Sequence, residues 1–348
     1  VPPPAVQKHV NTIDRGVEAI RHASLTSWWA WDKGPSPLFW RWPPGYQDPL
    51  RDGMKPMFKG DPPHTMEYQR PYSNEGLRSK EKKNIGKARV HGYLLAVFKV
   101  LALINVFSVP KGHDDIRMVY DGTVSGLNAA LWAPWFPLPT VESHLRVINP
   151  GTFMGDIDIG EMFLNFILHR ELRSLAGVDL TKYFPKDDKG SKVWEAWQRA
   201  AMGLTSSPYQ CVQAMGVAEE VIRGDRTDPE NVYRWDTVVL NLPGSEEYDP
   251  NRPWVCKFRL EDNRIAADLF IFVDDLRPTG SSRKEAWQAA CRAASTLNYL
   301  GIQDAPRKRR DSSQSPGAWA GSVVRTGKEG VHIMTSQEKW DKAKRLLE

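Results

Sequence analysis

The sequence is poor in cysteine and lacks any long apolar run, and each absence excludes a class of protein. Only three cysteines occur among 348 residues, and Cys211, Cys256 and Cys291 are too far apart to form a CxxC pair. A disulfide framework or structural zinc site is therefore not expected, and a reducing intracellular compartment, cytoplasmic or nuclear, is favoured over secretion. No apolar run approaches the ~20 residues that cross a bilayer, so no membrane partner is expected.

The charge balance is nearly even and excludes little. Lys and Arg number 47 against 42 Asp and Glu, and the net charge of +5 fits a polyanionic partner but is also common among other soluble proteins. The length allows one large domain or two to three smaller ones with a sizeable core. The chain starts at Val1 without a signal-like segment, so we expect it to be a piece of a longer polypeptide.

Residues 1–85 have few periodic stretches and many tryptophans and prolines, as in the segments 28–31 and 40–44. We expect an extended arm that lies over a folded body and is anchored by its indole rings, with base stacking as the alternative. A basic stretch follows at 79–89, across the end of the arm. This stretch predicts either a solvated helix face or a face turned toward nucleic acid.

The most informative segment is 267–276, an apolar run that ends in Asp274 and Asp275. Two adjacent carboxylates at the end of a buried strand repel each other and lose hydration, which is costly unless a cation compensates it. The two other Asp-Asp pairs of the chain lie in polar, turn-like sequence. We therefore predict a β-hairpin that presents Asp274 and Asp275 to a divalent metal.

A second strand with carboxylates is predicted near residue 156. Asp156 and Asp158 share one face of this strand, because side chains alternate with a period of two. A carboxylate from this strand that meets Asp274 would complete a two-metal site. Spacing alone leaves either residue as the ligand; the alternative role is capping or salt bridging, and we expect it for Asp156.

An apolar stretch at 94–109 predicts a strand that closes in a turn at 110–112 and is followed by a second strand at 116–120. Lys111 and Arg117 then lie close together near the tip of the hairpin. Two such cations suit a triphosphate, which Arg can contact in bidentate fashion, although exposed hairpins carry Lys and Arg routinely.

Two helices are expected on either side of the Asp274 hairpin in the sequence. Helix, strand hairpin and helix in this order predict an α+β domain whose helices pack on one face of a sheet. The expected caps and stops are Ser206 or Ser207 with Pro208 and Gly224 for the first helix, and Ser282 with Glu285 and Gly301 for the second.

In this order the motifs resemble those of reverse transcriptase catalytic cores, the RNA-directed DNA polymerases of LTR-type and tyrosine-recombinase (DIRS-type) retroelements. The resemblance covers roughly residues 86–345. The motifs are Val109-Pro110-Lys111 with Arg117–Asp121 and Leu127-Asn128; Asp158–Phe163; Gly203–Pro208; Phe272–Asp275; Leu300-Gly301 with Lys308; and Trp319–Gly321, before a thumb-like opening at Thr335–Trp340.

The resemblance implies an α+β right-hand polymerase. After the arm at 1–85 we expect fingers at 86–150, a palm with an antiparallel sheet and packed helices at 151–322, and the start of a thumb at 323–348. Pro208 and Asp274 are 66 residues apart (274 − 208), more than retroviral enzymes need, so residues of about 223–264 are expected to form an inserted hairpin. Other domains of a larger polyprotein are expected to be missing.

The same resemblance assigns roles to residues. Asp158, not Asp156, matches the first palm aspartate, because only Asp158 has an aromatic residue, Phe163, five positions later. Asp158 and Asp274 would hold two Mg²⁺ ions, with Mn²⁺ as a possible substitute and Asp275 in support. The other roles are dNTP binding by Lys111, Arg117, Phe163 and Gly203, protonation of pyrophosphate by Lys308, and contacts with an RNA or DNA template and its primer by Ser207, Pro208, Trp319 and Gly321.

Phe163 also favours dNTPs as substrates, because a bulky ring under the sugar would clash with a ribose 2′-hydroxyl. An RNA-dependent RNA polymerase is therefore one alternative, and an inactive or repurposed nucleic-acid-binding domain of a retroelement is the other. The intact aspartates argue against decay. Phe272 departs from the family pattern, since tyrosine is commoner there.

Overall fold

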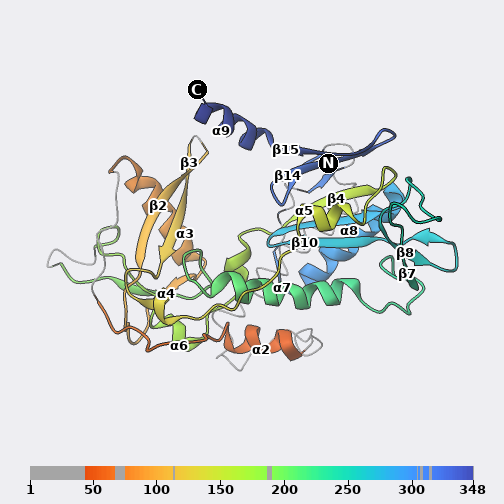
Figure 1. The fold of residues 1–348 in the computed structure, drawn as a ribbon. Helices are drawn as coiled ribbons and strands as arrows, with labels where there is room; N and C mark the ends of the chain where they lie inside the picture. Colours follow the sequence, from red (N-terminus) through yellow and green to blue (C-terminus); the bar gives the residue numbers. More distant parts are fainter. Residues whose placement is uncertain are drawn as a thin grey trace. The chain divides into compact units, whose positions relative to one another are not determined.

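The computed structural model describes residues 44–66, 75–112, 114–185, 190–303, 305, 309–312 and 316–347 (Figure 1). Most of the predicted N-terminal arm lies outside these residues. The described chain divides into two compact units, one within 137–160 and 215–347 and the other within 44–136 and 161–214. None of the helices in these ranges is long and apolar enough to cross a membrane.

The first unit is built around a four-stranded antiparallel sheet with the strand order β10-β11-β4-β12. β10 and β11 form a tight hairpin, and β4 pairs with the other edge of β11. The predicted strand pair with carboxylates at its end is therefore present. The strands are β4 (Phe153–Asp158), β10 (Asp268–Phe272), β11 (Asp275–Gly280) and β12 (Arg310–Asp311).

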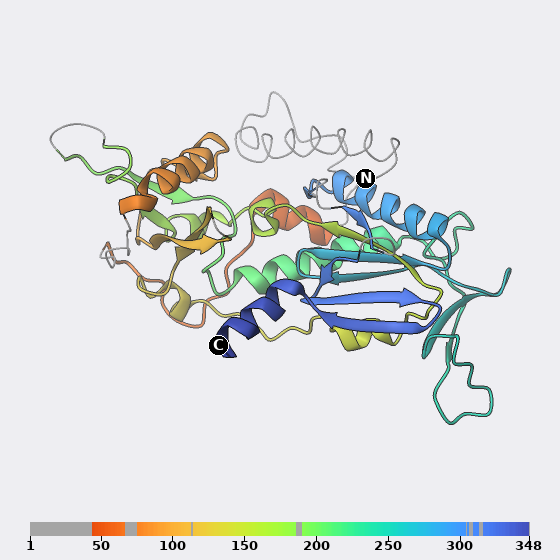
Figure 2. The same cartoon turned by 90° about the horizontal axis from the view of Figure 1, so that it is seen from above.

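The two faces of this sheet are covered by different layers. Gly155 of β4 faces the helix α8 (Arg283–Tyr299), where Ala290 lies nearby. The preceding residue, Met154, points the other way and packs with Ile148 and Val324. The second layer thus includes α5 (Val141–Leu145) and the strands β13 (Ala318–Trp319), β14 (Ser322–Gly327) and β15 (Gly330–Thr335), which α9 (Gln337–Leu347) follows (Figure 2).

The C-terminal ends of the two predicted helices lie where the sequence placed them, but their N-terminal caps differ from the prediction. Gly224 and Gly301, both with positive φ, follow α7 (Ser207–Arg223) and α8. The expectation that a serine side chain caps α7 is wrong, because the buried hydroxyls of Ser206 and Ser207 have no hydrogen-bond partner among the described residues. At α8, Ser282 Oγ accepts from the amide of Glu285 (3.2 Å), while the Glu285 carboxylate accepts from Ser281 rather than from Ser282.

The insertion forms more than the expected hairpin. β7 (Thr237–Leu240) and β8 (Val255–Arg259) pair as a hairpin, and β9 (Arg264–Ile265) adds a third strand in the order β7-β8-β9. Asp268 of β10 anchors this small sheet, because its carboxylate accepts from Lys257 Nζ and from Arg223 at 2.7 Å each. Both cations are partly buried, so these contacts fix the insertion firmly to the start of β10.

The second unit contains the hairpin of β2 (Asn105–Lys111) and β3 (Asp115–Asp121) and a sheet of order β1-β6-β5. The prediction of one strand over 94–109 is wrong before Asn105: Leu94–Leu95 forms β1, and the following residues are held by isolated contacts such as the bridge of Leu103 with Gly177. The remaining elements of this unit are α2 (Pro44–Asp52), η3 (Glu75–Leu77), α3 (Arg78–Val90), α4 (Leu127–Ala130), η4 (Met162–Asn165), α6 (Arg170–Arg173), β5 (Gly177–Asp179) and β6 (Trp194–Trp197).

The basic stretch at 79–89 lies on α3. Its lysines are exposed, whereas Glu81, Ile85 and Ala88 are buried against the rest of the unit. Glu81 accepts hydrogen bonds from Ser108 Oγ (2.7 Å) and from the Tyr183 hydroxyl (2.9 Å). The lysines therefore form an exposed helix face, as both predictions require.

Candidate active site

The two acidic segments meet at one end of the sheet of the first unit. Asp275, the first residue of β11, lies directly opposite Asp158, the last residue of β4. The amide of Ile159 donates to the carbonyl oxygen of Asp274 at 2.8 Å, which ties the hairpin turn to the end of β4. All three aspartates are half-buried. The sheet register thus brings together the carboxylate-bearing residues that the sequence had placed on separate strands.

Asp274 lies in the turn of the hairpin and not at the end of a strand. Phe272 pairs with Asp275, so Val273 and Asp274 form a two-residue turn. Such turns need a positive φ at their first residue, and Val273 has φ of 55°. A β-branched residue pays roughly 1–2 kcal/mol for this conformation. Backbone strain is therefore held at the turn that carries the carboxylate.

The three aspartate carboxylates are chemically suited to bind a hard divalent cation. Carboxylate oxygens are the ligands that Mg²⁺ prefers, and because Mg²⁺ retains several waters, few protein ligands suffice. Within the described ranges no three His, Cys, Asp or Glu side chains are already clustered as a metal site. Like charges repel one another unless a cation compensates them. The carboxylates therefore need not lie close together before a cation binds.

The buried side chain of Trp319 packs against the hairpin that carries Asp274 and Asp275. This side chain is 1% exposed, and its indole N–H donates to the carbonyl oxygen of Asp275 at 3.2 Å. The rings of Phe270 and Phe272 stand edge-on to it, with centroids at 6.3 and 6.0 Å. The half-buried aromatic ring at position 272 therefore packs against the buried indole of Trp319.

The structure changes the predicted contact between the Trp319 motif and a primer, because the tryptophan side chain is buried. A side chain that is 1% exposed offers no surface to a nucleic acid. Ala320 and Gly321 connect β13 to β14 in a two-residue turn with φ of 48° and 79°, the conformation that favours glycine. Any contact with a primer in this motif would come from this turn.

Asp156 has the structural role that the sequence predicted for it. Its carboxylate accepts from Arg277 Nε at 2.9 Å and from Ser312 Oγ at 2.9 Å. Arg277 is fully buried and also donates to the carbonyl of Gly317 at 3.2 Å, while its guanidinium lies 5.7 Å from the Trp319 ring centroid. Sequence reasoning missed Arg277; the one available signal was a charged residue directly between the apolar residues Leu276 and Pro278.

His144 of α5 closes the same buried cluster. It is fully buried, its ring centroid lies 4.5 Å from that of Phe270 and 5.1 Å from that of Trp319, and neither ring nitrogen has a hydrogen-bond partner within the described chain. Burial, and then the nearby charge of Arg277, lower the pKa of His144 to about 3, against a smaller opposing effect of Asp268. His144 is therefore neutral in the folded protein near neutral pH.

This burial predicts a pH dependence of stability. The unfolded chain takes up a proton at His144 below its ordinary pKa of about 6.5, whereas the folded chain does so only near pH 3, so stability is lost as pH falls through this window. Between pH 7 and pH 5 the free energy of unfolding should fall by up to about 2 kcal/mol more in wild type than in His144→Leu. Urea unfolding at both pH values measures this. His332→Leu, at an exposed histidine, should behave as wild type, and equal pH dependence of all three proteins would contradict the prediction.

Lys111 and Arg117 lie on the β2–β3 hairpin of the second unit. Lys111 pairs with Asp115 and Val109 with Arg117, so the two cations are two residues apart along the hairpin and share one face. Both are exposed, and neither makes an ion pair within the described chain. The predicted hairpin and the predicted proximity of its cations are confirmed.

Gly203 occupies a position that has no room for a side chain. Its φ is 104°, and a Cβ there would lie 2.5 Å from the carbonyl oxygen of Tyr120. Asn128, quoted in the sequence motif without a role, fastens the same loop: its Nδ2 donates to the Gly203 carbonyl (2.8 Å) and its Oδ1 accepts from the Thr205 amide (3.0 Å). The segment after β3 is thus locked to the loop before α7.

Gly203→Ala should therefore be strongly destabilising. Both the left-handed φ and the clash with backbone atoms oppose a methyl group, and we expect a loss of roughly 2 kcal/mol or more in the free energy of unfolding. Denaturant unfolding measures it. Gly216→Ala is the matched control, because Gly216 lies inside α7 with open space around it and should gain about 0.5–1 kcal/mol. Equal effects at the two sites would overturn the argument.

The remaining predicted site residues are placed as follows. Phe163 is half-buried in η4, and Ser207 and Pro208 open α7, with Ser207 almost fully buried. Because the Ser207 hydroxyl is not exposed, its predicted contact with template or primer would require a rearrangement of the helix start. Lys308 lies outside the described residues.

Comparison with known proteins supports the fold. No known family model matches the chain. An uncharacterized Caenorhabditis elegans protein, K02A2.6, is 25% identical over 205 residues, which is 59% of this chain and 13% of the worm protein. The foamy viral protease-reverse transcriptase in complex with double-stranded DNA superposes with a TM-score of 0.54 over 86% of this chain at 13% identity. The same viral protein with an RNA/DNA hybrid gives 0.52 over 82% at 14%.

These relatives are much longer than the chain, which spans 46% and 31% of the two viral chains. At such low identity the likeness concerns the fold alone. It agrees with the order of motifs along the sequence, and the mixed helix and sheet architecture is that of the viral structures. The described chain is therefore similar in fold to reverse transcriptases, the family that its motifs resemble.

Proposed function

We propose that this chain is the reverse transcriptase domain of a retroelement and synthesises DNA from dNTPs on an RNA or DNA template. The observation that carries the proposal is the sheet register that sets Asp158 opposite Asp275, with Asp274 in the adjoining turn. The fold adds support, because the similar viral structures contain double-stranded DNA or an RNA/DNA hybrid.

Asp158 and Asp274 would hold two Mg²⁺ ions, or Mn²⁺ as a substitute, and Asp275 would support them. Bound in this way, the ions would lower the pKa of the primer 3′-hydroxyl and stabilise the pyrophosphate leaving group. The protein's own part is to keep the carboxylates in place. Trp319, hydrogen-bonded to the Asp275 carbonyl, and the strained turn at Val273 do this from the buried side.

Charged residues of the second unit would bind the triphosphate. Lys111 and Arg117 are exposed on one hairpin face and lack carboxylate partners in the described chain, so their charge is available to phosphate oxygens. The loop that contains Gly203 would lie along the nucleotide, and Lys308 would protonate the departing pyrophosphate. Phe163 would exclude a ribose 2′-hydroxyl and so select dNTPs.

The test is extension of a DNA primer on an RNA template, with dNTPs and NTPs offered separately and Mg²⁺ present or chelated. Wild type should extend with dNTPs alone and only with Mg²⁺, and Asp274→Asn should abolish extension. Phe163→Ala should gain NTP incorporation. If wild type extended the primer with NTPs, the protein would be an RNA polymerase, and the proposed exclusion of NTPs by Phe163 would be wrong.

A binding measurement separates loss of metal from loss of fold. Mg²⁺ should raise the melting temperature of wild type and have little effect on Asp274→Asn, because a ligand that binds the folded state stabilises it. Absence of extension together with intact duplex binding would instead indicate a repurposed nucleic-acid-binding domain.

A further inference from the structure

β7 is an edge strand that lacks the usual protection of such strands. Within the described residues nothing pairs with its outer edge, and its sequence Thr-Val-Val-Leu has neither a charge nor a proline. Val238, Val239 and Leu240 are 42%, 43% and 61% exposed. Natural sheets block free edges with lysine, proline or bulges, because open N–H and C=O groups invite pairing with another strand. An unprotected apolar edge therefore indicates a partner.

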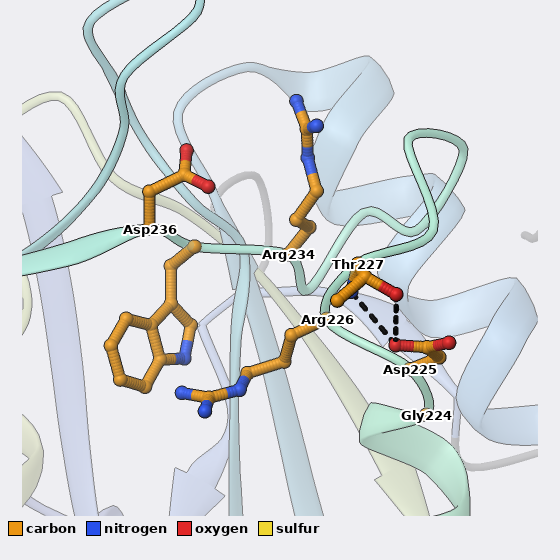
Figure 3. Close-up of a pocket in the computed structure, with 7 residues that line it drawn as sticks. Gly224, Asp225, Arg226, Thr227, Arg234 and Asp236 are labelled. Atoms are coloured by element: carbon orange, nitrogen blue, oxygen red, sulfur yellow. Dashed lines mark hydrogen bonds between the residues drawn. The ribbon is translucent and has the colours of Figure 1, made fainter.

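A hollow of about 770 Å³ lies where β7 begins, lined by residues of 224–227 and 234–236 (Figure 3). Arg226 extends away from Asp225 there, and its guanidinium lies 4.2 Å from the centroid of the Trp235 ring. The carboxylate of Asp225 accepts two hydrogen bonds from Thr227, one from its amide (2.8 Å) and one from its hydroxyl (2.7 Å). Arg226 is thus an exposed cation without a carboxylate partner in the described chain.

The opposite end of β7 carries exposed carboxylates and an exposed apolar side chain. The loop 241–254 is fastened to this end, because Asn241 Nδ2 donates to the carbonyls of Asp249 (2.8 Å) and Arg252 (3.1 Å). Leu242 in this loop is 46% exposed. Glu246 and Glu247 are exposed and make no ion pair with any described residue. One end of the strand therefore presents the exposed cation Arg226 beside a hollow, and the other presents Glu246 and Glu247 beside a projecting apolar side chain.

We propose that β7 pairs antiparallel with β7 of a second copy of this chain, about a two-fold axis. Antiparallel pairing places the start of each strand beside the end of the other. Leu242 of each copy then lies at the hollow beside Trp235 of the other, and Glu246 and Glu247 lie near its Arg226. Parallel pairing would instead place like charges together.

Charge favours a protein partner over nucleic acid at this edge. Residues 223–264 contain seven Lys and Arg and nine Asp and Glu, a net charge of −2 (7 − 9), while the whole chain is +5. A polyanion would be repelled by the insertion and has no cation to offer, whereas a second copy offers Arg226 to Glu246 and Glu247 and the two carboxylates to Arg226. The result is a self-complementary interface in which the two small sheets join into one continuous sheet.

Light scattering coupled to gel filtration, across a range of concentrations, tests the proposal. Wild type should reach the mass of two 39.5 kDa chains, and Val239→Lys should raise the dissociation constant of the dimer by roughly tenfold or more. Ile333→Lys is the matched control, because Ile333 is 50% exposed on β15 of another sheet, and it should leave the dimer intact. A wild type that stays monomeric throughout, or equal effects of the two lysines, would overturn the proposal.

Charge reversal tests the antiparallel arrangement. Arg226→Glu alone and the pair Glu246→Arg with Glu247→Arg should each weaken the dimer, and the three changes in one chain should restore it. All these side chains are exposed, so folding should be unaffected, and circular dichroism checks this. No recovery in the triple variant would rule out the antiparallel two-fold pairing.

Discussion

Asp158→Asn should lower the rate of primer extension by at least roughly a thousandfold, which corresponds to about 4 kcal/mol of transition-state stabilisation. An amide cannot supply the negative charge that holds a divalent cation, and Asp158 stands opposite Asp275 at the end of the sheet. Without Mg²⁺ the melting temperature should change little, because the carboxylate is half-buried and shares its surroundings with like charges. Single-turnover extension with dNTPs and differential scanning calorimetry measure the two quantities.

Asp156→Asn is the matched control, because it makes the same change two residues earlier on the same strand face. It should reduce stability, since the buried Arg277 loses its charged partner, while extension at a temperature where the protein is folded should be largely retained. If a folded Asp156→Asn lost as much activity as Asp158→Asn, the assignment of Asp158 as the catalytic aspartate would be wrong. The pair separates catalysis from support within one strand.

Much of this site could be predicted because local signals agreed with one another. The apolar run before Asp274, the alternation of Asp156 and Asp158, and the glycine after each flanking helix all act over a few residues. The hairpin with Lys111 and Arg117 was predicted in the same way. What the sequence did not indicate was that Asp274 would lie in the turn, because a valine with positive φ before it contradicts the ordinary preference of that residue.

The contacts that support the site escaped prediction because their partners are distant in the sequence. Trp319 contacts Asp275 across 44 residues, and Arg277 contacts Asp156 across 121. No periodicity or spacing rule connects such pairs. The strand expected over 94–109 failed for a related reason: Leu103 and Ile104 are buried like strand residues, yet the strand Asp115–Asp121 pairs with Asn105–Lys111 and not with them. Leu94–Leu95 also has a ladder partner, but it is a different strand, Trp194–Trp197. Burial explains the apolar run between the two strands, and a continuous strand was not needed for it.

Arg277→Met should produce the largest loss of stability in the first unit, about 3–5 kcal/mol in the free energy of unfolding. The guanidinium is fully buried between Asp156, the Gly317 carbonyl and the Trp319 ring, so its removal leaves the Asp156 carboxylate, 14% exposed, without its main partner. Adding Asp156→Leu should recover much of the loss, because an apolar pair replaces an isolated charge. Arg283→Met is the control: its ion pair with Asp311 is exposed, and it should cost less than about 1 kcal/mol. If both arginine variants lost the same stability, or if the double variant were no better than Arg277→Met, the strand pair that aligns Asp158 with Asp275 would not depend on this buried contact.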